Sequence, residues 1–251
     1  MVRRLLDSES SPDSLDLPSH SGISELGVRL LGLRAAQAYY QTLPTSDGLM
    51  ACADRILTDK NIDLLTIRAA ARCIPQRGAL LVTANHPTGI LDGVVLLAAL
   101  LSRRRDVRIV ANEAVCCIPV LADRVIPIQK TSSGNSGNRN AMTAIRSAWK
   151  RGECVIAFPA GTVAHWQWRG MHVADAPWNT SIQRFAARRG VLECRARLTI
   201  RNPLWFHVFA AISRKARSAL LLRAFFANHG KLPLQPINFD LLDPSDPIRK
   251  I

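Results

Sequence analysis

The sequence lacks any apolar run long enough to cross a membrane. Runs such as Val94–Leu101 are far shorter than the about 18 residues that a spanning helix needs. The pattern of a secretory signal peptide is missing too, because Arg3 and Arg4 are followed by acidic and serine residues instead of an apolar core. We therefore expect neither a transmembrane helix nor a signal peptide, which leaves association with a membrane surface open.

Cysteine motifs are also missing. The six cysteines contain no Cys-x-x-Cys pair, and most of them lie in apolar runs. This pattern argues against a disulfide framework or a metal site and is typical of small core residues in a reducing compartment. Two histidines, His165 and His172, lie among Trp166, Trp168 and Trp178. They lack further ligands at zinc spacing, so an aromatic rim at a membrane interface is the better interpretation, beside ordinary packing.

Acidic residues are scarce. The formal net charge is +14, and no acidic residue occurs between Glu193 and Asp240, where basic residues alternate with large apolar ones. Such a chain favours anionic partners: nucleic acid, a membrane surface or a charged acceptor. The span from 193 to 240 is typical of a basic segment that binds anionic lipid, although a helix packed on the sheet with a solvated basic face has the same pattern. No nucleic-acid-binding motif is present, so we expect no nucleic-acid partner.

The chain of 251 residues is expected to form one domain. Residues 1–22 are rich in Ser, Asp and Pro and are expected to be disordered, and residues 23–63 follow a helical pattern. In residues 64–251, strand-like and helix-like segments alternate. Strands are predicted at 79–82, 107–110, 124–130, 154–158 and 191–200, with an edge strand at 232–237. The alternation predicts an α/β fold, a mostly parallel or mixed sheet flanked by helices.

The chain is organised around the stretch from Val82 to Gly93, which contains His86 and Asp92. A histidine at a strand-to-helix turn is well placed to act as a general base. A carboxylate a few residues further on can fix the tautomer of the ring and stabilise the imidazolium. The pair therefore predicts a dyad that deprotonates a hydroxyl or an amine. Taken alone, a histidine beside an apolar run is more often structural, and Asp92 could be only a helix N-cap.

Three blocks of residues carry a resemblance to a known family. They are Asn85-His86 with Asp92, the run Arg124–Lys130, and Phe158-Pro159-Ala160-Gly161-Thr162. In their order and spacing they resemble the glycerolipid acyltransferases of the 1-acylglycerol-3-phosphate type. More narrowly, the chain is similar to the hemolysin-like branch of the lysophospholipid acyltransferases, which has His-Pro-x-Gly-x-x-Asp-Gly and Phe-Pro-Ala-Gly turns. The resemblance extends over about residues 64–240 and includes Arg201 and the residues after it.

The resemblance implies a glycerol-3-phosphate acyltransferase-like fold and an enzyme of lipid metabolism, cytoplasmic and peripheral on the inner membrane face. It implies that a long acyl chain moves from acyl-CoA or acyl-carrier protein to the hydroxyl of a lysophospholipid. His86 is then the general base and Asp92 orients it, without a metal or a bound cofactor. The implied substrate-binding residues are Asn85, Gly89, Lys130, Phe158, Pro159, Gly161, Thr162 and Arg201.

The chain departs from the common motifs of the family in two places. His86 and Asp92 are separated by one residue more than usual, so they meet only if His86 precedes the helix and the chain kinks at Pro87 and Gly89. In the third block, Ala160 and Val163 replace an acidic residue and an arginine. Lys130 and Arg169 are the nearby basic residues that could replace the arginine. Two alternatives follow: acylation of another lysolipid, such as a lyso-ornithine lipid, or a non-catalytic lipid-binding protein with this fold.

Overall fold

The computed structural model describes residues 32–128, 136–167, 170–212, 220–227 and 236–242. Its main feature is a six-stranded sheet with strand order β3-β2-β4-β1-β7-β8. The strands of this sheet are β1 (Leu80–Ala84), β2 (Val107–Asn112), β3 (Val125–Ile128), β4 (Cys154–Ala157), β7 (Leu192–Leu198) and β8 (Ile237–Leu242). The first five pair in parallel, and β8 runs antiparallel to β7 at the edge. The predicted single-domain α/β fold with a mixed sheet is confirmed.

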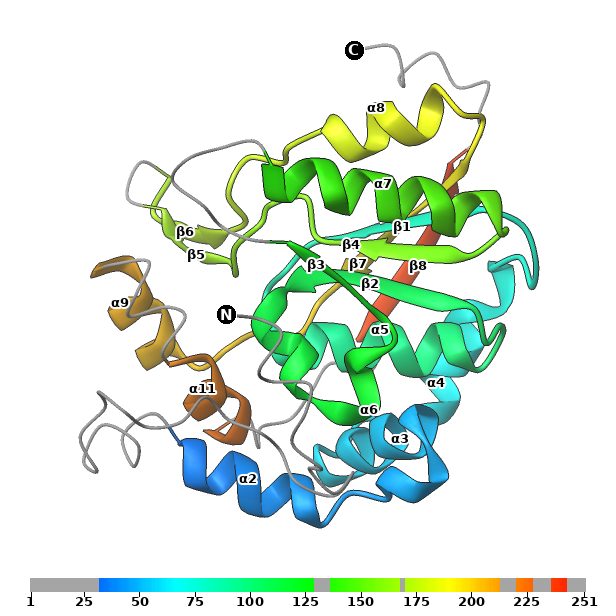
Figure 1. Cartoon of the computed structure of the whole chain (residues 1–251). Helices are drawn as coiled ribbons and strands as arrows, with labels where there is room; N and C mark the ends of the chain where they lie inside the picture. The colour runs from blue at the N-terminus through cyan, green and yellow to red at the C-terminus, as the bar shows by residue number, and fades with distance from the viewer. Residues whose placement is uncertain (1–31, 129–135, 168–169, 213–219, 228–235, 243–251) are drawn as a thin grey trace.

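Helices cover both faces of the sheet (Figure 1). The helices of the described residues are α2 (Leu33–Gln41), α3 (Leu49–Asp59), α4 (Leu64–Ala70), α5 (Ile90–Leu101), α6 (Pro119–Ala122), α7 (Ser136–Lys150), α8 (Ser181–Ala187), α9 (Leu204–Ile212) and α11 (Leu221–Ala227). Short 3-10 turns lie at Thr45–Asp47 (η2), Ala71–Cys73 (η3) and Glu113–Cys117 (η4). A two-stranded hairpin, β5 (His165–Gln167) with β6 (His172–Ala174), follows β4. In the described part of the chain, no helix is both long and apolar enough to span a bilayer.

The alternation of side chains along β1 shows why both faces are buried. Leu80, Val82 and Ala84 belong to the core beneath α3, α4 and α5, whereas Leu81 belongs to the core beneath α7 and α8. All five residues of β1 are buried. Because crossover helices cover both faces of a parallel sheet, its central strands are mostly apolar, and the apolar run 79–82 predicted this strand. The one polar residue of β1, Thr83, is buried, and its hydroxyl donates to Glu193 at 3.0 Å.

The predicted boundaries differ from the observed ones in several places. The first strand ends at Ala84 and not at Val82, and α5 begins at Ile90 before the predicted apolar run. The short hairpin β5–β6 was not predicted, because its strands have three residues each and lack a period-2 apolar pattern. The edge strand begins at Ile237, where the predicted one ends; residues 228–235 lie outside the described part, as do residues 1–31, which include the segment expected to be disordered.

The six cysteines are all free, but only three of them are core residues. Cys52, Cys154 and Cys194 are buried, and burial raises the pKa of the Cys154 thiol to about 12. Cys73 and Cys117 are exposed, so the expectation that cysteines act as small core residues is wrong for these two. Among the described residues, no group of three or more His, Cys, Asp or Glu side chains could hold a metal ion.

Candidate active site

The candidate site lies where two neighbouring parallel strands end. The chain leaves β1 through α5 on one face of the sheet and leaves β4 toward α8 on the other. In α/β sheets, such a point, where neighbouring connections go to opposite faces, opens a crevice at the carboxyl ends of the strands. His86 follows β1 and Phe158 follows β4, and their rings stack with centroids 4.0 Å apart at an interplanar angle of 30°. The topology therefore brings two of the predicted blocks together.

His86 and Asp92 are in contact. His86 Nδ1 lies 3.1 Å from Asp92 Oδ2, with the histidine side chain 19% exposed and the carboxylate 0% exposed. The geometry at Nδ1 does not meet the angle of a hydrogen bond, so the two groups are in close contact without a formed bond. Nε2, the other ring nitrogen, has no partner among the described residues. It is the nitrogen that a substrate could reach.

Three donors hold the carboxylate of Asp92 in place. The backbone N–H groups of Thr88 and Gly89 each donate to Oδ2 at 2.8 Å, and the Thr88 hydroxyl donates a short bond to Oδ1. Asp92 is the third residue of α5 and reaches back to its first turn, so it is a capping residue but not the N-cap, which is Gly89. Charge-assisted bonds of this kind compensate for the burial of a carboxylate, as does the positive end of a helix.

Gly89 makes the longer spacing between His86 and Asp92 possible. Its φ of 84° lies in the region that residues with a side chain rarely adopt. A Cβ at this position would lie 2.8 Å from Leu221 Cδ2 and 3.2 Å from Val163 Cγ2. The chain can therefore kink before α5 begins, and the side chain of His86 lies outside the helix, where it meets Asp92.

The backbone of His86 is fixed on both sides. Its N–H donates to both carboxylate oxygens of Asp175 at 3.2 Å, and its carbonyl accepts from the N–H of Ala164 at 2.8 Å. Trp178 Nε1 also donates to Asp175, at 3.0 Å. Burial raises the pKa of Asp175 despite these bonds. Sequence reasoning missed Asp175, because a single acidic residue far along the chain has no spacing rule that would connect it to His86.

Asn85 and Asn202 contact backbone groups. Asn85 donates to the carbonyl of Leu198 at 2.8 Å and accepts from its N–H at 2.7 Å, so it joins the ends of β1 and β7. Asn202 donates to the carbonyl of Pro87 at 3.2 Å, which attaches the segment before α9 to the histidine turn. Arg201 is exposed beside it. The nitrogen and the oxygen of the Asn85 amide are both bonded to the backbone of Leu198, so Asn85 holds the two strand ends together and any role toward a substrate is indirect.

The turn after β4 closes on itself. The N–H of Gly161 donates to the carbonyl of Phe158 at 2.9 Å, so this N–H is not directed at a ligand. Pro159 is buried, and its carbonyl accepts from the N–H of Asn179 at 3.0 Å. Gly161 has a φ of 60° and is exposed, and a Cβ there would meet nothing within 4 Å. Thr162, at the end of the turn, is partly exposed.

Val163 stands where the third block of the family has an arginine. Its side chain is 4% exposed and belongs to an apolar cluster between this turn, α9 and α11, together with Phe206, Ala210 and Ala224. An arginine could not be buried there without a partner. Lys130 and Arg169, the predicted substitutes, lie outside the described residues.

The aromatic residues predicted to form a rim lie on the hairpin β5–β6 and in the segment after it. Trp166 and Trp178 are partly exposed, and Trp168 lies outside the described residues. His165 Nδ1 lies 3.2 Å from the carbonyl of Val163, and His172 Nδ1 lies 2.8 Å from that of Gly170. These histidines therefore stabilise local turns.

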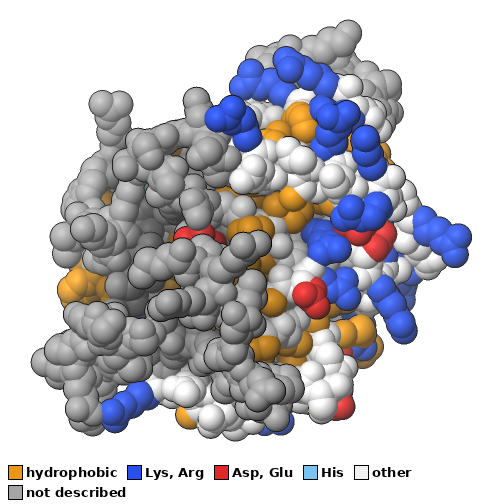
Figure 2. All heavy atoms as spheres, viewed as in Figure 1, with side chains coloured by type: hydrophobic (Ala, Val, Ile, Leu, Met, Phe, Trp, Pro, Cys, Tyr) orange, Lys and Arg blue, Asp and Glu red, His pale blue; other side chains and the backbone are white. Residues whose placement is uncertain are grey.

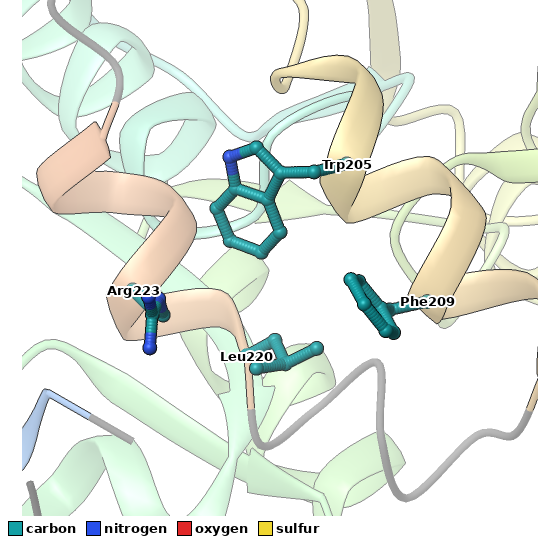
Figure 3. A pocket seen from close by; sticks show the side chains of 4 residues that line it. All are labelled: Trp205, Phe209, Leu220 and Arg223. Carbon is teal, nitrogen blue, oxygen red and sulfur yellow. The ribbon is translucent and has the colours of Figure 1, made fainter. Parts of the chain in front are cut away.

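A pocket lies between α9 and α11, next to the histidine turn. Its volume is about 440 Å³, and it is lined by Trp205, Phe209, Leu220 and Arg223 (Figure 3). Trp205 and Phe209 come from α9, and Arg223 comes from α11. Leu221, the residue after Leu220, packs against Gly89. Lining side chains that are apolar, together with the guanidinium of Arg223, suit an amphiphile with an anionic group.

A comparison with known families gives one match. A family model described as Acyltransferase matches residues 65–219, more than half of the chain. The match contains the histidine turn, the turn after β4 and α9. No curated protein matches the chain.

Proposed function

Because the chain belongs to this acyltransferase family, we propose that it moves a long-chain acyl group from an acyl thioester to the hydroxyl of a lysophospholipid, such as 1-acylglycerol-3-phosphate. The observation that carries the proposal is the 3.1 Å contact between His86 Nδ1 and the buried carboxylate of Asp92 at the carboxyl end of β1. The donor is acyl-CoA or acyl-carrier protein.

The proposed reaction needs no covalent enzyme intermediate. His86 takes the proton of the acceptor hydroxyl at Nε2, and the acceptor oxygen attacks the carbonyl carbon of the thioester. The C–S bond then breaks, and the imidazolium returns its proton to the leaving thiolate. Asp92 stabilises the imidazolium while it exists and keeps Nδ1 as the ring nitrogen that faces the carboxylate. The ring of Phe158, stacked on His86, restricts how far the imidazole can turn.

The pocket between α9 and α11 supports a lipid substrate. Its apolar walls suit an acyl chain, and its edge is formed by α9, where Leu204 and Val208 are 83% and 64% exposed. The same helix buries Phe206 and Ala210, so α9 has one packed side and one exposed apolar side. We propose that this exposed side meets the membrane that supplies the acceptor, on the cytoplasmic face, and that exposed basic residues such as Arg201 and Arg223 favour anionic lipid.

One observation favours a second acceptor. Since Val163 is packed in an apolar cluster, the third block has no guanidinium to bind a phosphomonoester. An acceptor without that group, such as a lyso-ornithine lipid, is therefore the alternative to 1-acylglycerol-3-phosphate.

Purified protein with a labelled acyl thioester and a panel of lysolipids tests the proposal, and the expected result is one acylated product. His86→Ala should lower the rate by about 10²–10⁴-fold. His172→Ala removes an exposed histidine of the hairpin and should leave the rate unchanged. If the folded protein transfers no acyl group to any acceptor and still binds lipid vesicles, the enzymatic interpretation is wrong and a lipid-binding protein remains.

A further inference from the structure

The layer formed by α7 and α8 carries only basic charges. The two helices lie on the same face of the sheet and share one apolar core, in which Trp149 and Phe185 contact each other with ring centroids 5.7 Å apart. Neither helix contains an acidic residue. The basic residues of the two helices and of the positions directly after them are Arg139, Arg146, Lys150, Arg151, Arg184, Arg188 and Arg189.

The spacing of these residues directs them outward. On α7, Arg139, Arg146 and Lys150 are exposed and follow one side of the helix, whereas Ala141 and Ile145 face the sheet. On α8, Arg184 and Arg188 are one turn apart and exposed. Figure 2 shows the molecule from the same side as Figure 1, and Lys and Arg side chains are gathered at the end where α7 and α8 lie.

Most of these charges are free to bind a partner. Arg151 pairs with Glu153 at 2.9 Å, and the Arg189 guanidinium lies 3.6 Å from the centroid of the Phe185 ring. In the part of the chain that the structure describes, the other five have no acidic partner. They are Arg139, Arg146, Lys150, Arg184 and Arg188. A surface that carries only positive charges attracts an acidic partner and raises the rate at which the two associate.

We propose that the α7–α8 face binds a small acidic protein, the acyl-carrier protein that presents the acyl thioester. The identity of this partner rests on the proposed function. The exposed large apolar side chains of the described residues lie elsewhere, so this face has nothing to insert into a bilayer. It also has no exposed aromatic ring on which a nucleic-acid base could stack.

The position of the face relative to the site supports this partner. Crossover helices run antiparallel to the strands of a parallel sheet, so α7 and α8 begin at the edge of the sheet where His86 lies. The loop that enters α8 contains Asp175, which binds the backbone of His86. A carrier bound along α7 and α8 therefore lies beside the edge of the sheet at which His86 is placed, opposite the layer of α3, α4 and α5.

A matched pair of charge reversals tests the proposal. Arg188→Glu changes the α7–α8 face, and Arg72→Glu makes the same change of charge at an exposed position on η3, in the opposite layer. We expect Arg188→Glu to raise the KM for acyl-carrier protein by about tenfold and to leave kcat and the KM for acyl-CoA unchanged. Arg72→Glu should leave all three unchanged. The loss in Arg188→Glu should shrink as salt rises, because salt screens exposed charges.

Direct binding separates this proposal from the proposed function. Fluorescence anisotropy with labelled, unacylated carrier protein should show binding that Arg188→Glu weakens and Arg72→Glu does not. Such binding supports the docking face even if no donor supports transfer. The proposal is overturned if the protein uses acyl-CoA but does not bind the carrier. It is also overturned if Arg188→Glu abolishes binding to phosphatidylglycerol vesicles and leaves carrier binding intact, since the face is then a membrane surface.

Discussion

Two turns follow the neighbouring strands β1 and β4, and they differ in how they are held. Each contains a glycine with positive φ, Gly89 in the first and Gly161 in the second. Thr88 and Gly89 of the first turn are buried, and Asp92, Asp175 and Asn202 bind the backbone of this turn, whereas the second turn closes a bond on itself, accepts a bond from Asn179 and leaves its glycine exposed. The comparison teaches that side-chain hydrogen bonds to the backbone are concentrated at the histidine turn, and that the second turn contributes the Phe158 ring and the buried side chain of Val163.

The largest expected effect is that of Asp92→Asn, which removes the charge from the first turn. Without the carboxylate the imidazolium is not stabilised, and an amide can place its NH₂ group toward donors. We expect kcat to fall by about 10²–10⁴-fold with a smaller change in KM, measured as acyl transfer under saturating acceptor. Asp123→Asn, at the exposed end of α6, is the control. An unchanged kcat in Asp92→Asn would remove the dyad from the mechanism.

The two glycines provide a direct test of the comparison. Gly89→Ala places a Cβ against Leu221 and Val163 at an unfavourable φ, and we expect it to lower the free energy of unfolding by about 3 kcal/mol. Gly161→Ala meets open space and should cost only about 1 kcal/mol, for its backbone conformation. Urea denaturation measures both. Equal losses would show that the two turns are constrained to the same degree.

Phe158→Leu tests the contribution of the second turn to the first. The substitution keeps an apolar side chain of similar size but removes the ring that stacks on His86. An aromatic contact of this kind contributes about 1 kcal/mol, so we expect kcat/KM to fall by about fivefold. Phe185→Leu removes a ring from α8, away from the site, and should leave kcat/KM unchanged.

The smallest expected effect is a change in the pH dependence of stability through Asp175. Because burial raises its pKa in the folded state above the ordinary 3.8, folding favours the protonated acid. Asp175 therefore contributes stability below pH 3.8, and this contribution is lost as pH rises through the raised pKa. Asp175→Asn removes this slope, so the variant should gain stability relative to the natural protein as pH rises through that window. Urea midpoints across pH measure it, and parallel curves would contradict the assignment.

Local sequence patterns predicted the parallel strands well, because their apolar runs and the glycines that end the helices are local signals. The three sequence blocks were recognisable for the same reason. The exact ends of the strands and the hairpin β5–β6 could not be predicted, since short strands depend on neighbours that are distant in the chain. Asp175 and the pocket between α9 and α11 could not be predicted either, because each is formed by residues that only folding brings together.

By itself, the sequence determined the class of the fold, the histidine turn with its acidic partner, and the absence of charge at Val163. Only the tertiary structure decided that His86 and Asp92 meet across their longer spacing, since this depends on the kink at Gly89 and on the packing of α11 against it. It also decided that the basic residues of two separate helices form one face. The physical reason is that charges and side chains interact through space, whereas a sequence pattern relates only residues that are close together in the chain.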